Sequence, residues 1–186
     1  HAVNEAVIAS LEHLEGYRNV LHFLHETGDS DYEKVSSAYR SAGWQERADV
    51  RGRIEDMPAA YAGADVIICR AGASTCAEIT AAGKAAIMIP FPFAADDHQV
   101  QNARALEKAG AVAVILQQDL SGERLAKDLG FLISTPERIG QIETASRKLA
   151  RPDATKVIVD LVEQLIRRKR HPSNGMSHLS SGSASL

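Results

Sequence analysis

Three runs of apolar residues constrain the fold of this 186-residue chain most strongly. They are DVIIC at 65–69, AAIMIPF at 85–91 and AVAVIL at 111–116. Strands that are apolar at almost every position are buried on both faces, which is typical of parallel sheets covered by helices. Segments with helical patterning separate these runs, so strands and helices alternate. The pattern predicts an α/β fold with a doubly wound, Rossmann-like parallel sheet.

The remaining segments continue this alternation of strands and helices. Further strands are expected at 20–28 and 48–54. Helices are expected at 2–13, 31–42, 57–64, 75–82, 97–109, 122–132, 136–149 and 154–168. One domain is therefore expected over 1–170, followed by a disordered tail at 171–186, because that serine-rich segment contains no Lys, Arg, Asp or Glu.

Composition argues against several functional classes. The chain has 21 basic and 24 acidic residues and a net charge of −3, which gives no reason to expect bulk binding of nucleic acid. Cys69 and Cys76 match no common zinc pattern and are expected to be free thiols. No apolar run approaches the roughly 18 residues that a membrane span requires. The basic segment IRRKRH at 166–171 fits either contact with an anionic membrane or, preferably, a solvated helix end.

The segment AGASTCAE, at 71–78, has two interpretations. In the first, small residues let the backbone approach a ligand, and Ser74 and Thr75 begin a helix whose free N–H groups suit a phosphate. Glu78, one turn later, could then accept hydrogen bonds from ribose hydroxyls. In the second, Thr75 and Glu78 form a capping box, S/T-x-x-E, and Glu78 only satisfies backbone N–H groups. Taken alone, the motif favours the capping interpretation.

The segment DDHQVQNA follows the second apolar run and begins another expected helix. Asp97 can cap this helix, which places His98, Gln99 and Asn102 in or just after its first turn. Their side chains carry donors and acceptors that could contact sugar hydroxyls. A polar helix start without any ligand explains the segment equally well.

The segment RIEDMP, at 53–58, follows a short expected strand. Such a loop can offer backbone N–H and C=O groups to a flat base, although a plain turn is the favoured interpretation. His22 and His25 are expected on opposite faces of the preceding strand, which disfavours a shared metal site. His25, with Thr27 and Gly28, is expected to shape a loop instead.

Taken together, these motifs resemble one family. HETG, IEDMPAAYAGADVIICRAGAST, IPFPFAADDHQ and LEKAGA resemble, in order, the C-terminal half of the MurG family of bacterial UDP-N-acetylglucosamine–N-acetylmuramyl-(pentapeptide) pyrophosphoryl-undecaprenol N-acetylglucosaminyltransferases. The resemblance runs from about Ala2 to Leu165. It implies a GT-B fold whose C-terminal domain binds a UDP-sugar donor, and inverting transfer of N-acetylglucosamine from UDP-N-acetylglucosamine to lipid I, giving lipid II for peptidoglycan. It also implies a peripheral location at the cytoplasmic face of the inner membrane, without metal or other cofactor.

The resemblance further implies a donor site. Its residues would be Ile54, Met57, Ser74, Thr75, Glu78, His98, Gln99 and Asn102. The first two would lie at the uracil, which the backbone of Ile54 would hold. Ser74 and Thr75 would bind phosphate, and Glu78 would hold the ribose hydroxyls. The last three would surround the N-acetylglucosamine, with Gln99 the best candidate for its hydroxyls.

The chain departs from the family pattern in three respects. Ser74 stands where leucine is often found, and Phe93 where histidine is common. The resemblance implies an N-terminal domain and a GGS-type loop before Ala2, and we expect the chain to be a fragment or a truncated gene product without them, whose sheet should lack its first strand. The general base and the lipid I site are expected on that missing half. The chain alone is expected to bind UDP weakly, if at all, and not to transfer sugar.

Two alternatives remain beside this interpretation. The chain could be the UDP-sugar-binding subunit of a split enzyme or of a different GT-B glycosyltransferase. It could also be a non-catalytic domain that binds nucleotide sugars.

Overall fold

The computed structural model describes residues 1–94 and 97–170, with side chains to residue 167. It divides into a compact unit, His1–Ala150, and a second unit that begins at Arg151. The predicted disordered tail, 171–186, lies outside the described residues.

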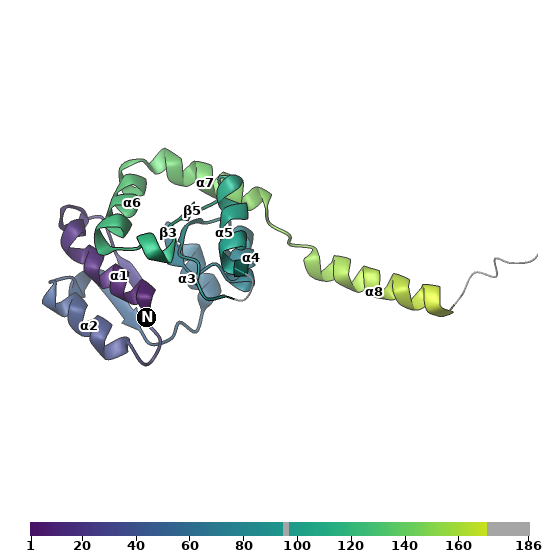
Figure 1. Ribbon diagram of the computed structural model, residues 1–186, viewed down its shortest axis with the longest axis horizontal. Coiled ribbons are helices and arrows are strands. Elements are labelled where there is room, and N and C mark those ends of the chain that lie inside the picture. Colours follow the sequence, from purple (N-terminus) through teal and green to yellow (C-terminus); the bar gives the residue numbers. More distant parts are fainter. Residues whose placement is uncertain (95–96, 171–186) are drawn as a thin grey trace, which may run out of the picture. The chain divides into compact units, whose positions relative to one another are not determined.

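Within the described residues, five strands form two parallel sheets in the compact unit (Figure 1). One sheet pairs β1 (Phe23–Glu26) with β2 (Ala48–Arg51). The other has the order β3-β4-β5, formed by Val66–Cys69, Ala85–Met88 and Ala113–Val114. All three strand pairs are parallel, as the unbroken apolar runs predicted.

The two separate sheets can be compared with the strand order of a complete Rossmann-like domain. That order is 3-2-1-4-5-6. If β1 and β2 take positions 2 and 3, and β3, β4 and β5 take positions 4, 5 and 6, removing the first strand leaves these two groups. The observed topology therefore agrees with the expectation of a sheet without its first strand.

Helices alternate with the strands, close to the predicted positions. The α-helices are α1 (Ala2–Ser10), α2 (Tyr32–Ser41), α3 (Met57–Gly63), α4 (Ala73–Ala82), α5 (His98–Lys108), α6 (Gly122–Ser134), α7 (Pro136–Lys148) and α8 (Ala154–Arg170). The 3-10 helices are η1 (Leu11–Tyr17), η2 (Gln45–Arg47) and η4 (Gln117–Asp119). The helix predicted at 2–13 is in fact α1 followed by η1.

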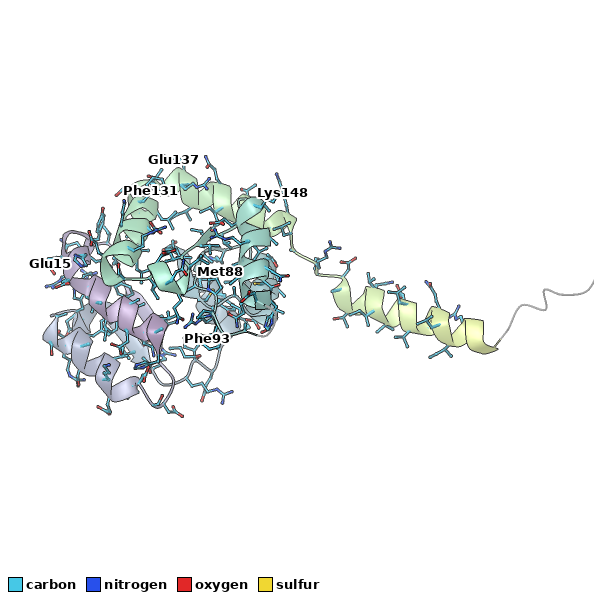
Figure 2. All side chains as sticks on the ribbon, in the orientation of Figure 1. Glu15, Met88, Phe93, Phe131, Glu137 and Lys148 are labelled. Carbon is cyan, nitrogen blue, oxygen red and sulfur yellow. The ribbon has the colours of Figure 1, made fainter. Side chains whose placement is uncertain are left out.

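The central strand β4 shows why the apolar runs predicted burial on both faces. Ala85, Ile87 and Ile89 belong to the core cluster that contains residues of α1, α6 and α7. Ala86 and Met88 belong to a second cluster with residues of α4 and α5. All five side chains are fully buried, and Figure 2 labels Met88 in the interior. Helices therefore cover both faces of this sheet, which confirms the α/β prediction.

The described part of the second unit consists of residues 151–153 followed by helix α8. Apolar side chains spaced as on one helix face, at Val157, Ile158, Leu161, Val162 and Leu165, are exposed. Over the described residues, none of the helices is both long enough and apolar enough to cross a bilayer.

Candidate functional site at the carboxyl ends of the strands

Helix α4 begins immediately after the loop that follows β3. Its N-cap is Gly72, and its first helical hydrogen bond runs from the Cys76 N–H to the Gly72 carbonyl at 2.9 Å. The predicted capping box is therefore wrong, because the helix begins two residues earlier than expected and Thr75 lies inside its first turn. The amides of Ala73, Ser74 and Thr75 point out of the helix end without a helical acceptor. They form a group of donors suited to an anion.

Glu78 lies on the same face of α4 as these first-turn residues. Ser74 and Thr75 precede it by four and three positions, which places the three side chains side by side. Ser74 and Glu78 are exposed, and Thr75 is half-buried. The Tyr61 hydroxyl on α3 donates to Glu78 Oε2 at 2.9 Å. Glu78 therefore contacts a neighbouring helix rather than the backbone of its own helix end.

The loops after β1 and β2 meet beside α3. The backbone N–H of Ile54 donates to Glu26 Oε2 at 2.7 Å, and Ile54 is only 9% exposed. The Asp56 carboxylate caps α3 by accepting from the Ala59 N–H at 2.9 Å. Met57 is the first residue of that helix and is half-buried. The predicted base-binding amide of Ile54 thus has an internal acceptor already.

The start of α5 packs against the loop after β3. Gln99 Oε1 accepts from the Phe91 N–H at 3.0 Å. Asn102 Nδ2 donates to the Ala71 carbonyl at 3.2 Å. Both predicted sugar-binding side chains thus hold loop backbone, with Gln99 Nε2 and Asn102 Oδ1 as their other polar atoms.

Asp97 holds the N-cap position of α5 in an unexpected way. Its backbone is left-handed, with φ of 53°, and its side chain makes no capping hydrogen bond. The prediction that its side chain caps the helix is therefore wrong. His98, the first residue of α5, is exposed at the same edge.

Arg70 is a residue of this edge that the sequence did not single out. Its Nη1 donates to the carbonyls of Ile89 and Pro90 at 3.1 and 3.3 Å. Its guanidinium lies 5.5 Å from the centre of the Phe91 ring, which contacts Phe93 edge-on at 5.7 Å. Phe93, labelled in Figure 2, is 82% exposed. Arg70 therefore fastens the loop after β4 to the loop after β3.

His25 is a buried structural residue. Asn4 Nδ2 donates to the Thr27 carbonyl at 2.9 Å, which leaves its Oδ1 to accept from His25 Nε2 at 3.2 Å. His25 Nδ1 then accepts from the Tyr39 hydroxyl at 3.2 Å. Burial lowers the pKa of His25 to about 4, so the ring is neutral at pH 7. This network fixes the strand end that carries Glu26, in line with the predicted loop-shaping role.

The part of the chain that the structure describes contains potential metal ligands and the two cysteines. No group of three or more His, Cys, Asp or Glu side chains there is arranged to hold an ion. Cys69 and Cys76 are free, as predicted. Burial raises the pKa of the Cys69 thiol to about 12, which keeps it protonated.

The geometry is that of an α/β domain that binds a nucleotide at the carboxyl ends of its strands. The segments that follow β2, β3 and β4 carry the predicted site residues, at the carboxyl edges of parallel strands where α/β domains bind nucleotides. A helix end with free amides lies among them. Comparison with known families is more specific. The model of the glycosyltransferase family 28 C-terminal domain matches residues 1–161, so the chain belongs to this family.

Curated relatives agree with the family. A protein of Anaeromyxobacter sp. (strain Fw109-5), named UDP-N-acetylglucosamine–N-acetylmuramyl-(pentapeptide) pyrophosphoryl-undecaprenol N-acetylglucosamine transferase, is 47% identical over 91% of this chain. A protein of the same name from Geotalea uraniireducens (strain Rf4) is 49% identical over 86% of it. The chain spans only 44% and 43% of these relatives. It thus corresponds to less than half of each.

Solved structures agree as well. The crystal structure of MurG from Acinetobacter baumannii matches with a TM-score of 0.78 and 35% identity, covering 88% of this chain and 46% of that one. The glycosyltransferase VinC, solved in complex with dTDP, matches with a TM-score of 0.59 and 18% identity, covering 85% of this chain and 40% of that one. The second match shows a shared fold alone.

Proposed function

We propose that this chain is the donor-binding part of an inverting glycosyltransferase that moves N-acetylglucosamine from UDP-N-acetylglucosamine to lipid I, giving lipid II for peptidoglycan. The observation that carries the proposal is the family match, which runs over residues 1–161 and includes all eight predicted site residues. The names of the relatives support the donor and the acceptor.

The start of α4 is the proposed seat of the diphosphate. The free amides of Ala73, Ser74 and Thr75 and the positive end of the helix dipole favour a dianionic group. The same groups would stabilise UDP as it leaves, and stabilising the departing charge is the main task in this chemistry. We propose that this arrangement serves without a metal ion.

The remaining parts of the donor have proposed contacts on either side of α4. Glu78 would accept hydrogen bonds from the ribose hydroxyls. The Ile54 N–H and C=O pair would meet the uracil imide, which presents a carbonyl acceptor beside an N–H donor. Gln99 Nε2 would reach the sugar hydroxyls, beside His98 and Asn102. We further propose that the acceptor, the catalytic base and peripheral contact with the inner membrane belong to the rest of the enzyme.

Calorimetric titration tests the donor site. UDP and UDP-N-acetylglucosamine should release binding heat with the folded chain, and CDP and ADP should bind more weakly. Cytosine reverses the donor and acceptor pattern that the Ile54 backbone would read, and adenine is larger than uracil. Equal heats for UDP, CDP and ADP, or no UDP heat in a folded sample, would contradict the proposal.

Turnover tests the assignment of the acceptor side. The chain alone should not convert lipid I to lipid II in the presence of UDP-N-acetylglucosamine, whereas a full-length relative should do so in the same assay. Product formation by the chain alone would show that the base and acceptor site do not lie in the rest of the enzyme.

A further inference from the structure

Tyr61 connects the two helices that flank the proposed nucleoside position. It lies on α3, one turn after Met57, and its hydroxyl donates to Glu78 Oε2 on α4 at 2.9 Å. The C-terminal end of α3 is held as well, because Lys84 Nζ donates to the carbonyls of Ala62 and Ala64 at 3.0 and 2.8 Å. Tyr61 therefore projects from a helix that is fixed in place.

The direction of this hydrogen bond follows from the chemistry of the two groups. Burial, and then the hydrogen bond to Glu78, raises the pKa of Tyr61 above its usual value, so the phenol keeps its proton. A carboxylate can only accept. Tyr61 is therefore the donor, and Glu78 stays an acceptor toward any further partner.

The bond leaves acceptor capacity on Glu78. An ionised carboxylate has about four lone-pair positions, of which Tyr61 uses one. Glu78 is an exposed residue. The hydrogen bond from the phenol also restricts rotation of the carboxylate. This rotational freedom would otherwise be lost only when a ligand binds. Preorganisation of this kind increases affinity by lowering the entropy cost of binding.

We propose that Tyr61 is a positioning residue that holds the Glu78 carboxylate in place for the cis-diol of a ribose, and thereby favours ribonucleotides over deoxyribonucleotides. The inference rests on the proposed function, because it takes Glu78 as the acceptor for the ribose hydroxyls. It adds a residue on a different helix, 17 positions away in sequence, to the donor site.

If Tyr61 had a purely structural role, removing its hydroxyl would leave ligand selectivity unchanged. The Tyr61 ring packs against the core cluster formed by α4, α5 and β4. Tyr61→Phe keeps that ring and removes only the hydroxyl, so packing is preserved. A change in ligand selectivity in this variant therefore comes from the hydrogen bond.

The test is a double-mutant cycle with two ligands, UDP and 2′-deoxyuridine diphosphate. Tyr61→Phe should weaken UDP binding about 3- to 10-fold and reduce the preference for UDP over the deoxy ligand. In the Glu78→Ala background the same substitution should have no further effect, because Tyr61 acts through Glu78. Tyr17→Phe is the matched control, since it removes a hydroxyl that lies 3.3 Å from Ser134 Oγ, away from the site.

The outcomes separate the two proposals. If Tyr61→Phe leaves the preference for UDP over its deoxy counterpart unchanged, or weakens UDP binding equally with and without Glu78, the positioning role is overturned. If the unmodified chain does not bind UDP at all, the proposed donor site is overturned, and the role of Tyr61 with it.

Discussion

The two sides of the candidate site differ in whether their backbone amides already have hydrogen-bond acceptors. On the side of β1 and β2, the Ile54 N–H is bonded to Glu26 at 2.7 Å and Ile54 is buried. On the side of α4, Ser74 and Glu78 are exposed and the first-turn amides have no helical acceptor. We call the β1–β2 side closed, because a protein carboxylate occupies its amide, and the α4 side open, because its first-turn amides have no helical acceptor.

The difference has a consequence for how a nucleotide would bind. A diphosphate can meet the α4 amides without displacing a protein group. A base that uses the Ile54 amide must first displace the Glu26 carboxylate, and that exchange lowers the net gain from the new hydrogen bond. Affinity is therefore expected to come mainly from the α4 side. The predictions below test this asymmetry, from the largest expected effect to the smallest.

Acidification should lower the free energy of unfolding, because His25, which lies on the closed side, is buried as a neutral ring. Its pKa of about 4 in the folded chain lies below the usual 6.5, so the unfolded chain binds this proton more readily. The stability due to neutral His25 is present above about pH 6.5 and is lost as the pH falls towards 4. The loss should approach about 3 kcal/mol. Denaturant unfolding between pH 7 and pH 4 measures it.

Two variants provide the control. His25→Gln should flatten the decline in stability over this pH range, whereas His22→Gln, at an exposed position just before β1, should leave it in place. An unchanged decline in His25→Gln would mean that other groups cause it.

Glu78→Ala should damage the open side most. Loss of the charged acceptor should weaken UDP binding on the order of 10- to 100-fold, because hydrogen bonds to charged groups contribute about 1.5–3 kcal/mol. The free energy of unfolding should change by less than about 1 kcal/mol, since Glu78 does not cap its helix. Titration and denaturant unfolding measure the two quantities. Glu143→Ala, which removes a half-buried carboxylate that pairs with exposed Arg147, is the matched control. A loss of stability with unchanged affinity would assign Glu78 a structural role.

Glu26→Ala should open the closed side. Removing the carboxylate frees the Ile54 N–H, so UDP affinity should rise by up to about 10-fold while the folded chain loses some stability. Glu26→Gln retains an acceptor oxygen and should show a smaller rise. Weaker UDP binding in Glu26→Ala would instead indicate that Glu26 contacts the nucleotide.

Gln99→Ala should have the smallest effect. Its Oε1 is already bonded to the Phe91 amide, so only Nε2 remains for the sugar. The variant should lose about 3-fold in affinity for UDP-N-acetylglucosamine and little for UDP. Equal losses for both ligands would indicate that Gln99 acts by holding its loop.

The sequence predicted the layers of the fold better than the details of the site. The apolar run at 85–91 implied a strand buried on both faces, and β4 is such a strand. Local pattern misplaced the start of α4, because Thr75 and Glu78 fit a capping box, whereas the N-cap is Gly72 and the helix begins at Ala73. A local pattern could not choose between two starts only two or three residues apart.

The contacts that organise the site could not be predicted from local pattern. Glu26 meets Ile54 across 28 positions of sequence, and Tyr61 meets Glu78 across 17. Each pair depends on how two loops or helices pack on the sheet. Sequence did supply one usable signal for Glu26, which is its position at the end of an expected strand, where parallel sheets bind ligands.

The central claim is that the loops at the carboxyl ends of these strands form one nucleotide site. The most direct measurement is a titration of the ¹⁵N-labelled chain with UDP, followed through the backbone amide resonances. The largest shifts should fall at Ala73, Ser74 and Thr75, with smaller ones at Ile54 and the start of α5. Shifts confined to α6 and α7, or none at saturating UDP, would contradict the account.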